Sequence, residues 1–92
     1  MYFVLFYTTA DDFINRRAPF REEHLQHVRD AYDNGDLVMA GALAEPADAA
    51  LLVFKGDSPD AARKFAQNDP YVKQGLVIEW QVRPWSVVIG NK

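Results

Sequence analysis

The pattern of apolar and polar positions in the first half of the chain predicts a strand, a loop and a helix. Residues 2–7 are an uninterrupted run of aromatic and branched side chains, which is long enough for a strand and too short for a helix. Residues 8–18 show no periodicity and are expected to form a loop. Apolar side chains then recur at helical spacing over residues 19–34. Pro19 suits the first position of this helix, and Gly35 suits the position after its end.

The second half of the chain predicts a hairpin, a second helix and a last strand. Apolar runs at residues 37–44 and 49–55 are joined by a short polar connection, so they are expected to pair as antiparallel strands. Residues 58–68 begin with a serine and a proline that favour a helix start. Residues 76–85 alternate as in a strand with one buried face, and residues 87–89 are expected to add a short terminal strand. The apolar side of the strand at 76–85 holds Leu76, Ile78, Trp80 and Val82.

The order strand, helix, strand, strand, helix, strand predicts an α+β fold of the ferredoxin-like type. In this βαββαβ sandwich, two helices lie on one face of an antiparallel sheet. A chain of 92 residues leaves no room for a second core, so residues 1–92 are expected to form a single domain. Residues 2–7 are apolar on both faces, yet two helices cover only one face of the sheet. We therefore expect the other face to be covered by the sheet of a second copy, in a homodimer or a higher homo-oligomer.

The helix predicted for residues 19–34 carries two polar side chains on its apolar face. Its packing stripe consists of Phe20, Leu25, Val28, Ala31 and Tyr32. Arg21 and His24 fall inside the same arc, although the opposite face of the helix has ample room for polar residues. A base and a cation placed where packing residues belong are the main indication of function in this sequence.

The predicted topology brings other polar residues to this position. In the ferredoxin-like fold, the start of the first helix and the end of the second lie at the same end of the sheet. Arg21 and His24 are therefore expected close to Asp69. Tyr7, at the end of the first strand, and Tyr71 should reach the same place. A carboxylate facing an imidazole raises its affinity for a proton and fixes its tautomer, so such a pair can transfer protons near neutral pH.

Several of these residues also have structural explanations that stay open. A histidine on a packing face is often hydrogen-bonded within a core, and an aspartate before a proline is often only a helix cap. Gly41, inside a predicted strand, is explained by a bulge or by the close approach of a ligand or of backbone. His24 and His27 have a spacing that can chelate a metal, but no third ligand is evident, so no metal site is predicted.

Composition and charge argue against several functions. The net charge is -3 and lysines and arginines form no cluster, which argues against nucleic acid as a partner. Arg16 and Arg17 are expected to be solvated surface charges. The absence of cysteine excludes disulfides and thiolate chemistry. No leader-like segment or run long enough to span a membrane is visible, so a cytoplasmic protein without a membrane partner is expected.

The chain resembles the YciI-like (YCII-related) family over almost its whole length. The resemblance is carried by Arg21-x-x-His24-Leu25, Gly35-x-Leu37, Ala40-Gly41, Asp69-Pro70-Tyr71-Val72, Gly75-Leu76 and Arg83-Pro84-Trp85. It implies a ferredoxin-like fold that dimerises through its sheet, as in the dimeric α/β barrels that include muconolactone isomerase. It also implies an active site on a His-Asp pair, which corresponds to His24 and Asp69. Some relatives eliminate HCl from chlorinated hydroxyquinol intermediates of aromatic degradation.

Two functional hypotheses follow, of which the first is a cofactor-independent isomerase or lyase acting on a small cyclic, phenolic or enolisable compound. His24 would be its general base and acid, Asp69 the partner that orients His24, and Arg21 the group that holds a substrate anion. Tyr7 and Tyr71 would supply a hydroxyl donor or an aromatic wall, and Gly41 would border the substrate. The second hypothesis is an accessory domain whose pocket binds a small ligand without reaction. A purely structural dimerisation module is a third reading, and it predicts no pocket near His24.

Overall fold

The structure, a computed structural model, describes residues 1–90 and places the strands and the two longer helices in the predicted order. The elements are β1 (Tyr2–Thr9), α1 (Phe13–Arg16), η1 (Ala18–Phe20), α2 (Arg21–Asp33), β2 (Leu37–Ala42), β3 (Ala49–Lys55), α3 (Asp60–Asn68), α4 (Pro70–Lys73) and β4 (Val77–Trp85). The predicted ferredoxin-like α+β fold is confirmed, and the short segments α1, η1 and α4 are additions to it.

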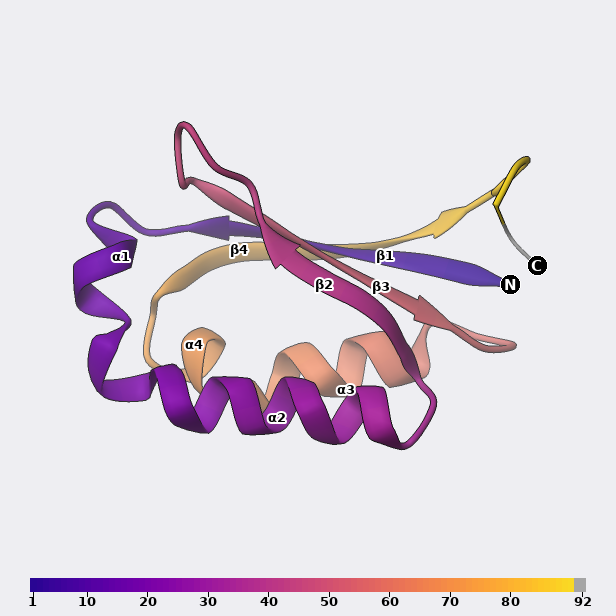
Figure 1. The fold of residues 1–92 in the computed structure, drawn as a ribbon, viewed down its shortest axis with the longest axis horizontal. Coiled ribbons are helices and arrows are strands. Elements are labelled where there is room, and N and C mark those ends of the chain that lie inside the picture. Colours follow the sequence, from indigo (N-terminus) through magenta and orange to yellow (C-terminus); the bar gives the residue numbers. More distant parts are fainter. Residues whose placement is uncertain (91–92) are drawn as a thin grey trace.

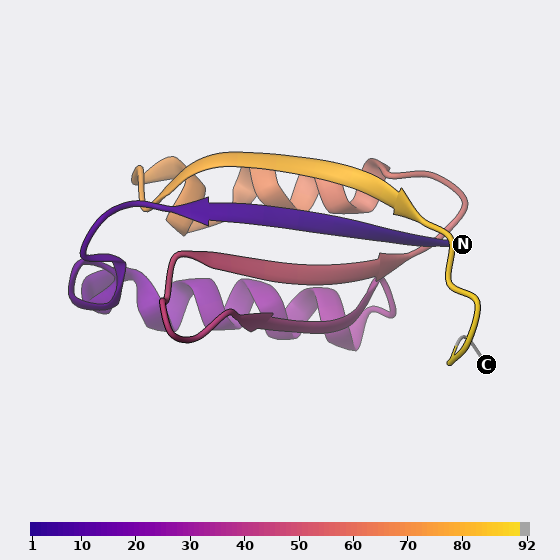
Figure 2. The same ribbon diagram turned by 90° about the horizontal axis from the view of Figure 1, so that it is seen from above.

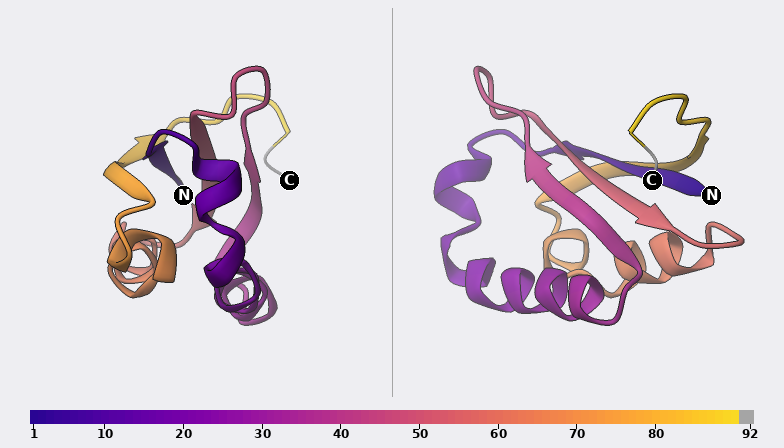
Figure 3. Two further views of the ribbon diagram at one scale, coloured as in Figure 1. Left: turned by 90° about the vertical axis from the view of Figure 1, so that its left-hand side faces the viewer. Right: turned by 45° about the vertical axis from the view of Figure 1, so that its right-hand side comes forward.

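The strands form one antiparallel sheet in the order β2-β3-β1-β4. The predicted hairpin is confirmed as the pair β2 and β3. α2 and α3 lie side by side against one face of the sheet (Figures 1 and 2). No helix or strand of residues 1–90 covers the opposite face (Figure 3). The molecule therefore has two layers, with one face of its sheet open.

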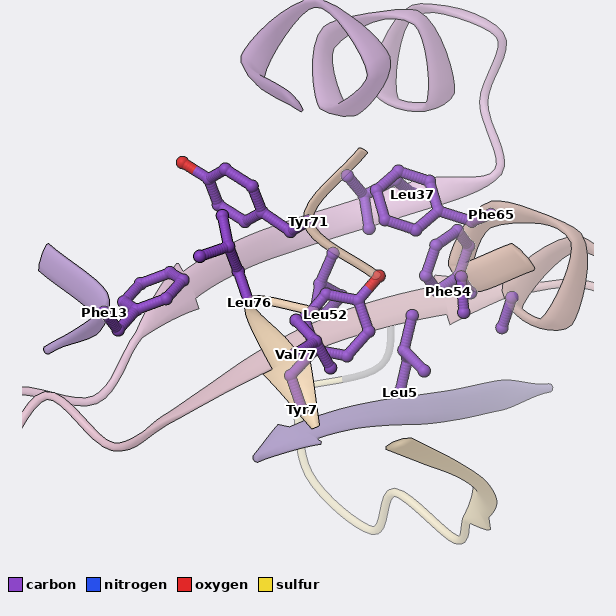
Figure 4. Close-up of a cluster of buried hydrophobic side chains, with 12 residues drawn as sticks. Leu5, Tyr7, Phe13, Leu37, Leu52, Phe54, Phe65, Tyr71, Leu76 and Val77 are labelled. Carbon is purple, nitrogen blue, oxygen red and sulfur yellow. The ribbon is translucent and has the colours of Figure 1, made fainter. Parts of the chain in front are cut away.

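The hydrophobic core lies between the sheet and the helices. Residues of β1 alternate between this core and the open face, as a pleated strand requires. Phe3, Leu5 and Tyr7 point inward and are at most 3% exposed, whereas the residues between them are half-buried. α3 contributes its buried residues Ala62, Phe65 and Ala66. Figure 4 shows Leu5 and Tyr7 on β1 facing Phe54, Phe65 and Tyr71 from other elements.

α2 is amphipathic and lies at the margin of the core. None of its side chains is fully buried, and Val28 and Ala31 pack against the core from the helix surface. Tyr32 was expected in the packing stripe, but it is 61% exposed. It lies at the edge of the apolar arc, and α2 packs over the edge strand β2, so that flank of the helix faces solvent. Within residues 1–90, no helix has both the length and the apolar character needed to cross a bilayer.

The loop predicted for residues 8–18 is wrong, because part of this segment is helical. Asn15 donates a side-chain hydrogen bond to Oδ1 of Asp12 at 2.8 Å, which stabilises the first turn of α1. Phe13 is buried beneath this turn at 6% exposure, and burial of an aromatic ring stabilises a short helix that propensity alone would not. Pro19 consequently lies within η1 and not at the first position of α2.

A β-bulge changes the predicted faces of β4. The register between β1 and β4 shifts after Thr8, which leaves Ile78 without a partner residue on β1. Ile78 is 65% exposed, so its placement on the buried side was wrong, whereas Leu76 is 2% exposed. Trp80 and Val82 remain on the helix side and pack against the core. Sequence alternation counts residues and cannot detect the extra one that a bulge inserts.

Two strand ends also differ from the prediction. β2 ends at Ala42. Ala42 pairs with Ala50, and β3 begins at Ala49, so β3 has almost no further residues with which a longer β2 could pair. The terminal strand expected at residues 87–89 does not form. Trp85 already pairs with Tyr2, the first residue of β1, so β1 has no further length against which a continuation of β4 could pair.

From the bulge in β4 we predict how substitutions at Leu76 and Ile78 change the free energy of unfolding. Leu76→Ala should lower the free energy of unfolding by about 2–5 kcal/mol, because it opens a cavity in the core. Ile78→Ala removes a side chain of similar size from the surface and should change it by about 0.5 kcal/mol or less. Urea unfolding of the two variants and the wild type measures both values. Equal losses at the two positions would contradict the bulge.

Candidate active site

Asp69 lies at the junction of α3 and α4 and is completely buried, with an exposed fraction of 0%. The ring of Pro70 excludes the preceding residue from helical conformation, and Asp69 accordingly has extended backbone angles of φ -72° and ψ 125°. Its Oδ1 accepts a hydrogen bond from the backbone N–H of Tyr71 at 3.0 Å, which caps α4. The turn between the two helices thereby fixes a carboxylate inside the molecule.

Side chains from two other elements also donate to this carboxylate. The hydroxyl of Tyr7, on β1, donates to Oδ2 at 2.7 Å. Nδ1 of His24, on α2, lies 2.8 Å from Oδ1. A buried carboxylate is costly unless hydrogen bonds satisfy it, and here donors from β1, α2 and α4 surround both oxygens. Asp69 therefore joins three segments that are distant in sequence.

The contact with Asp69 determines which nitrogen of His24 is available for chemistry. Because a carboxylate only accepts hydrogen bonds, Nδ1 of His24 carries a proton, and Nε2 holds the lone pair when the ring is neutral. Within residues 1–90, Nε2 makes no hydrogen bond. The His24 side chain is 14% exposed and lines a cavity. Nε2 is thus able to accept a proton from a molecule bound there.

Aromatic rings hold the imidazole in place. The ring of Tyr71 stacks on His24 with centroids 3.7 Å apart and an interplanar angle of 6°. Phe13 meets the same tyrosine edge to face, at 5.4 Å and 88° (Figure 4). The guanidinium of Arg17 lies over the face of Phe13, 5.3 Å from its centroid. Four side chains therefore form a continuous stack from α1 to α2 through α4, which restricts rotation of the histidine ring.

Burial keeps both tyrosine hydroxyls of the site protonated. Desolvation raises the pKa of Tyr7 well above its ordinary value, and the charge of Asp69 and its hydrogen bond raise it further. Burial also raises the pKa of Tyr71, although the charges of Arg17 and Arg21 act in the opposite direction. Both residues are therefore neutral hydrogen-bond donors at physiological pH.

A cavity of about 180 Å³ lies between the sheet, α1 and α2, beside His24. Its polar lining groups are His24, two arginines and the hydroxyl-bearing residues Tyr7, Thr9 and Tyr71. The other walls are mostly apolar, and they are formed by Phe13, Leu25, Val28, Ala40, Gly41, Ala42, Ala50 and Leu52. An apolar space of about 150 Å³ is known to accept a benzene ring, so this cavity suits a ligand of about one ring.

The structure brings the predicted site residues together, with two differences in detail. Arg21 lines the cavity, but it is solvent-exposed at the mouth and not packed within the helix face. Gly41 borders the cavity through its backbone. Its register partner is Leu51, which lies on the open face of the sheet, so a side chain at Gly41 would point away from the cavity. Apart from Gly41 and the residues next to it in sequence, no atom of residues 1–90 lies within 4 Å of the position of that Cβ. The bulge proposed for Gly41 is instead found between Leu37 and Met39.

Sequence reasoning missed two residues of the site, Phe13 and Arg17. Both line the cavity, whereas Arg17 was expected to be a solvated surface charge. Their segment was expected to be a loop. A spacing of four residues places two side chains on one face only if the segment is helical, so the spacing was not taken as a signal. That spacing, in a segment beginning with two aspartates, is the signal that could have identified them.

His27 has a structural role and lies outside the site. Its Nε2 is 2.9 Å from the backbone carbonyl of Phe65, and its ring stacks on the Phe65 ring at 4.2 Å. Both contacts connect α2 to α3. Among the described residues, no group of three or more potential metal ligands occurs.

Comparison with known proteins identifies matches over most of the chain. A family model described as the YCII-related domain matches residues 1–86. An uncharacterized protein from Haemophilus influenzae is 27% identical over 97 residues, which cover 96% of this chain and 99% of that protein.

A solved structure has the same fold. It is 5-chloro-2-hydroxyhydroquinone dehydrochlorinase (TftG) from Burkholderia phenoliruptrix AC1100, in complex with 2,5-dihydroxybenzoquinone. The TM-score is 0.77, and the match covers 94% of both chains at 19% sequence identity. At this identity the likeness concerns the fold.

The raised pKa of Tyr7 predicts how stability changes with pH. In the unfolded chain the hydroxyl ionises near its ordinary pKa of 10.0, whereas the folded protein retains the proton. The free energy of unfolding should therefore fall above about pH 10, with a contribution from Tyr7 of about 1.4 kcal/mol per pH unit. Tyr7→Phe should remove this contribution. It should also cost about 1–3 kcal/mol at neutral pH, because Asp69 loses a donor.

Urea unfolding of the wild type and Tyr7→Phe between about pH 8 and pH 11 checks this prediction. The two curves of stability against pH should converge as the pH rises. Parallel curves would show that the hydroxyl ionises equally in the folded and unfolded states.

Proposed function

The chain belongs to the YCII-related family, and from this premise we propose that it is a cofactor-independent enzyme that transfers protons on a small cyclic compound. The observation that carries the proposal is the hydrogen bond of 2.8 Å between His24 and Asp69, with His24 lining a cavity of single-ring size. An oriented imidazole beside such a space is suited to general acid-base catalysis.

In the proposed mechanism, Nε2 of His24 removes a proton from a carbon or hydroxyl of the bound ring. Asp69 stabilises the imidazolium that forms, and Tyr71 keeps the ring of His24 in plane. Arg21, at the cavity mouth, stabilises the negative charge that develops on the substrate. Tyr7 acts through Asp69, because its hydroxyl donates to that carboxylate. Tyr7 is therefore a positioning residue, and His24 is the catalytic base.

The proton abstracted by His24 has two possible fates. In an isomerisation, the imidazolium returns the proton to another atom of the substrate. In an elimination, the electrons of the broken bond form a double bond as a leaving group departs, and His24 later releases the proton to solvent. TftG is a dehydrochlorinase, and its ligand is a six-membered ring with oxygen substituents. This similarity favours elimination of HCl from a chlorinated hydroxyl-bearing ring as the first reaction to test.

The enzymatic activity of two histidine variants tests the catalytic proposal. The substrates are a panel of phenols, lactones and chlorinated hydroquinols, with product formation measured by chromatography and chloride release. His24→Gln should lower turnover by about 10²–10⁴-fold, because it removes the general base. His27→Gln is the matched control, since His27 contacts the Phe65 carbonyl outside the cavity, and its turnover should stay within about twofold of wild type.

Unchanged turnover in His24→Gln would contradict the assignment of the base. Binding of a panel compound without conversion by the wild type would favour the alternative function, a domain that binds a small ligand without reaction.

We also propose that a second copy of the chain covers the open face of the sheet. Val4, Phe6 and Leu51 are only half-buried on this face, and Met39 beside them is 64% exposed. A contiguous apolar patch of this kind marks an association surface. Such a patch suits the same surface of a second copy, related by a twofold axis.

The oligomeric state tests this second proposal. Phe6→Glu places a charge on the open face without touching the inward-facing residues of β1, so it should convert a dimer into a folded monomer. Light scattering coupled to gel filtration measures the mass, and circular dichroism checks the fold. A wild-type protein that is monomeric, or a Phe6→Glu protein that remains a dimer, would contradict the proposal.

A further inference from the structure

The hydroxyl of Tyr71 is a buried polar group without a partner. Tyr71 is 3% exposed, and within residues 1–90 its Oη makes no hydrogen bond. Arg21 is near enough for its charge and its N–H groups to act against the rise in the pKa of this hydroxyl. The contact does not, however, reach the distance and angle of a hydrogen bond. The residue lines the cavity, and its oxygen is at the end of the ring that points away from Phe54 and Phe65 (Figure 4). A buried hydroxyl of this kind normally has a partner, so a ligand group is the expected one.

Arg17 is a half-buried cation at the same part of the cavity, and it has no countercharge. Among the described residues it forms no ion pair. Its backbone is fixed, because its N–H donates to the carbonyl of Phe13 and its own carbonyl accepts from the N–H of Phe20, both at 2.9 Å. Its guanidinium rests on the ring of Phe13. The side chain is therefore already ordered before any ligand binds, which lowers the entropic cost of an interaction.

These groups are all hydrogen-bond donors. A guanidinium can only donate, and the protonated hydroxyl of Tyr71 has its hydrogen free to donate. The raised pKa of Tyr71 keeps that hydroxyl protonated, and Arg21 adds a second positive charge at the cavity mouth. His24 provides the base of this constellation, through Nε2. The cavity thus presents donors and positive charge together with a base.

We propose that Arg17 and the Tyr71 hydroxyl, supported by Arg21, form a subsite for an ionised oxygen on the ring of the substrate. The ligand class is a single ring carrying a carboxylate or a deprotonated hydroxyl. This inference rests on the proposed function for the idea that a small ring occupies the cavity, and it adds the charge and orientation of that ring. With its oxygen held at Arg17 and Tyr71, the ring presents another of its atoms to His24.

Binding of three probes tests the subsite by isothermal titration calorimetry. Benzoate carries a carboxylate, 2,5-dihydroxybenzoquinone carries ionisable oxygens directly on its ring, and benzamide is a neutral compound of the same size as benzoate. The wild type should bind at least one of the two anionic probes. If benzoate binds, its affinity should be at least about tenfold higher than that of benzamide. Comparison of the two anions distinguishes a carboxylate ligand from a ring-oxygen ligand.

Variants assign the effect to the subsite. Arg17→Gln should weaken binding of the anion about tenfold, and Tyr71→Phe should weaken it by a smaller factor while preserving the stacked ring. Arg17→Lys retains the charge without the planar fork and should fall between Arg17→Gln and the wild type. Arg16→Gln is the matched control. It makes the same change of charge at the neighbouring, exposed arginine, and its affinity should stay within about twofold of wild type.

Thermal unfolding of each variant verifies the fold before titration. The proposal is overturned if neither anion binds the wild type, if benzamide binds as tightly as benzoate, or if Arg17→Gln and Arg16→Gln have equal effects.

The His24→Gln variant separates failure of the subsite from failure of the proposed catalytic mechanism. If that variant retains turnover while Arg17→Gln loses anion binding, the acid-base mechanism fails and the subsite stands. If His24→Gln loses turnover while Arg17→Gln binds anions as the wild type does, the mechanism stands and the subsite fails.

Discussion

The hydrogen bonds to the carboxylate of Asp69 are the interaction on which the candidate site depends. A charged group with an exposed fraction of 0% is destabilising unless donors surround it, and those donors come from β1, α2 and α4. Satisfying this one carboxylate therefore fixes the relative positions of three segments that are distant in sequence. It also fixes the tautomer of His24, so a requirement of folding and a requirement of acid-base chemistry are met by the same contacts.

The stack of Arg17, Phe13, Tyr71 and His24 connects this carboxylate to the cavity. Each contact in it depends on a short helical segment, because Phe13 begins α1, Arg17 caps the end of α1, and α4 presents Tyr71. The two segments are additions to the ferredoxin-like order, and they carry much of the site. This arrangement is consistent with a common division of labour, in which a regular scaffold supplies rigidity and the connections between its elements supply the chemistry.

The fold was predictable from the sequence because its signals are local and repeated. The apolar run of β1, the alternation in β4 and the serine-proline start of α3 each report the conformation of neighbouring residues. The errors fell where a distant contact decides the local conformation. Phe13 is helical because its ring is buried against Tyr71, and Ile78 is exposed because the pairing with β1 slips by one residue. Neither partner can be inferred from the residues beside Phe13 or Ile78.

The sequence by itself determined the order of the elements, the family resemblance and the pairing of His24 with Asp69. It could do so because the connection rules of a βαββαβ fold bring the start of one helix to the end of the other. Only the tertiary structure decided how the groups around this pair are arranged. It placed the hydroxyl of Tyr7 on Asp69, gave the hydroxyl of Tyr71 no hydrogen-bond partner among residues 1–90 and brought Arg17 to the cavity. These outcomes depend on distances and burial between separate elements, and such quantities exist only after the chain has packed.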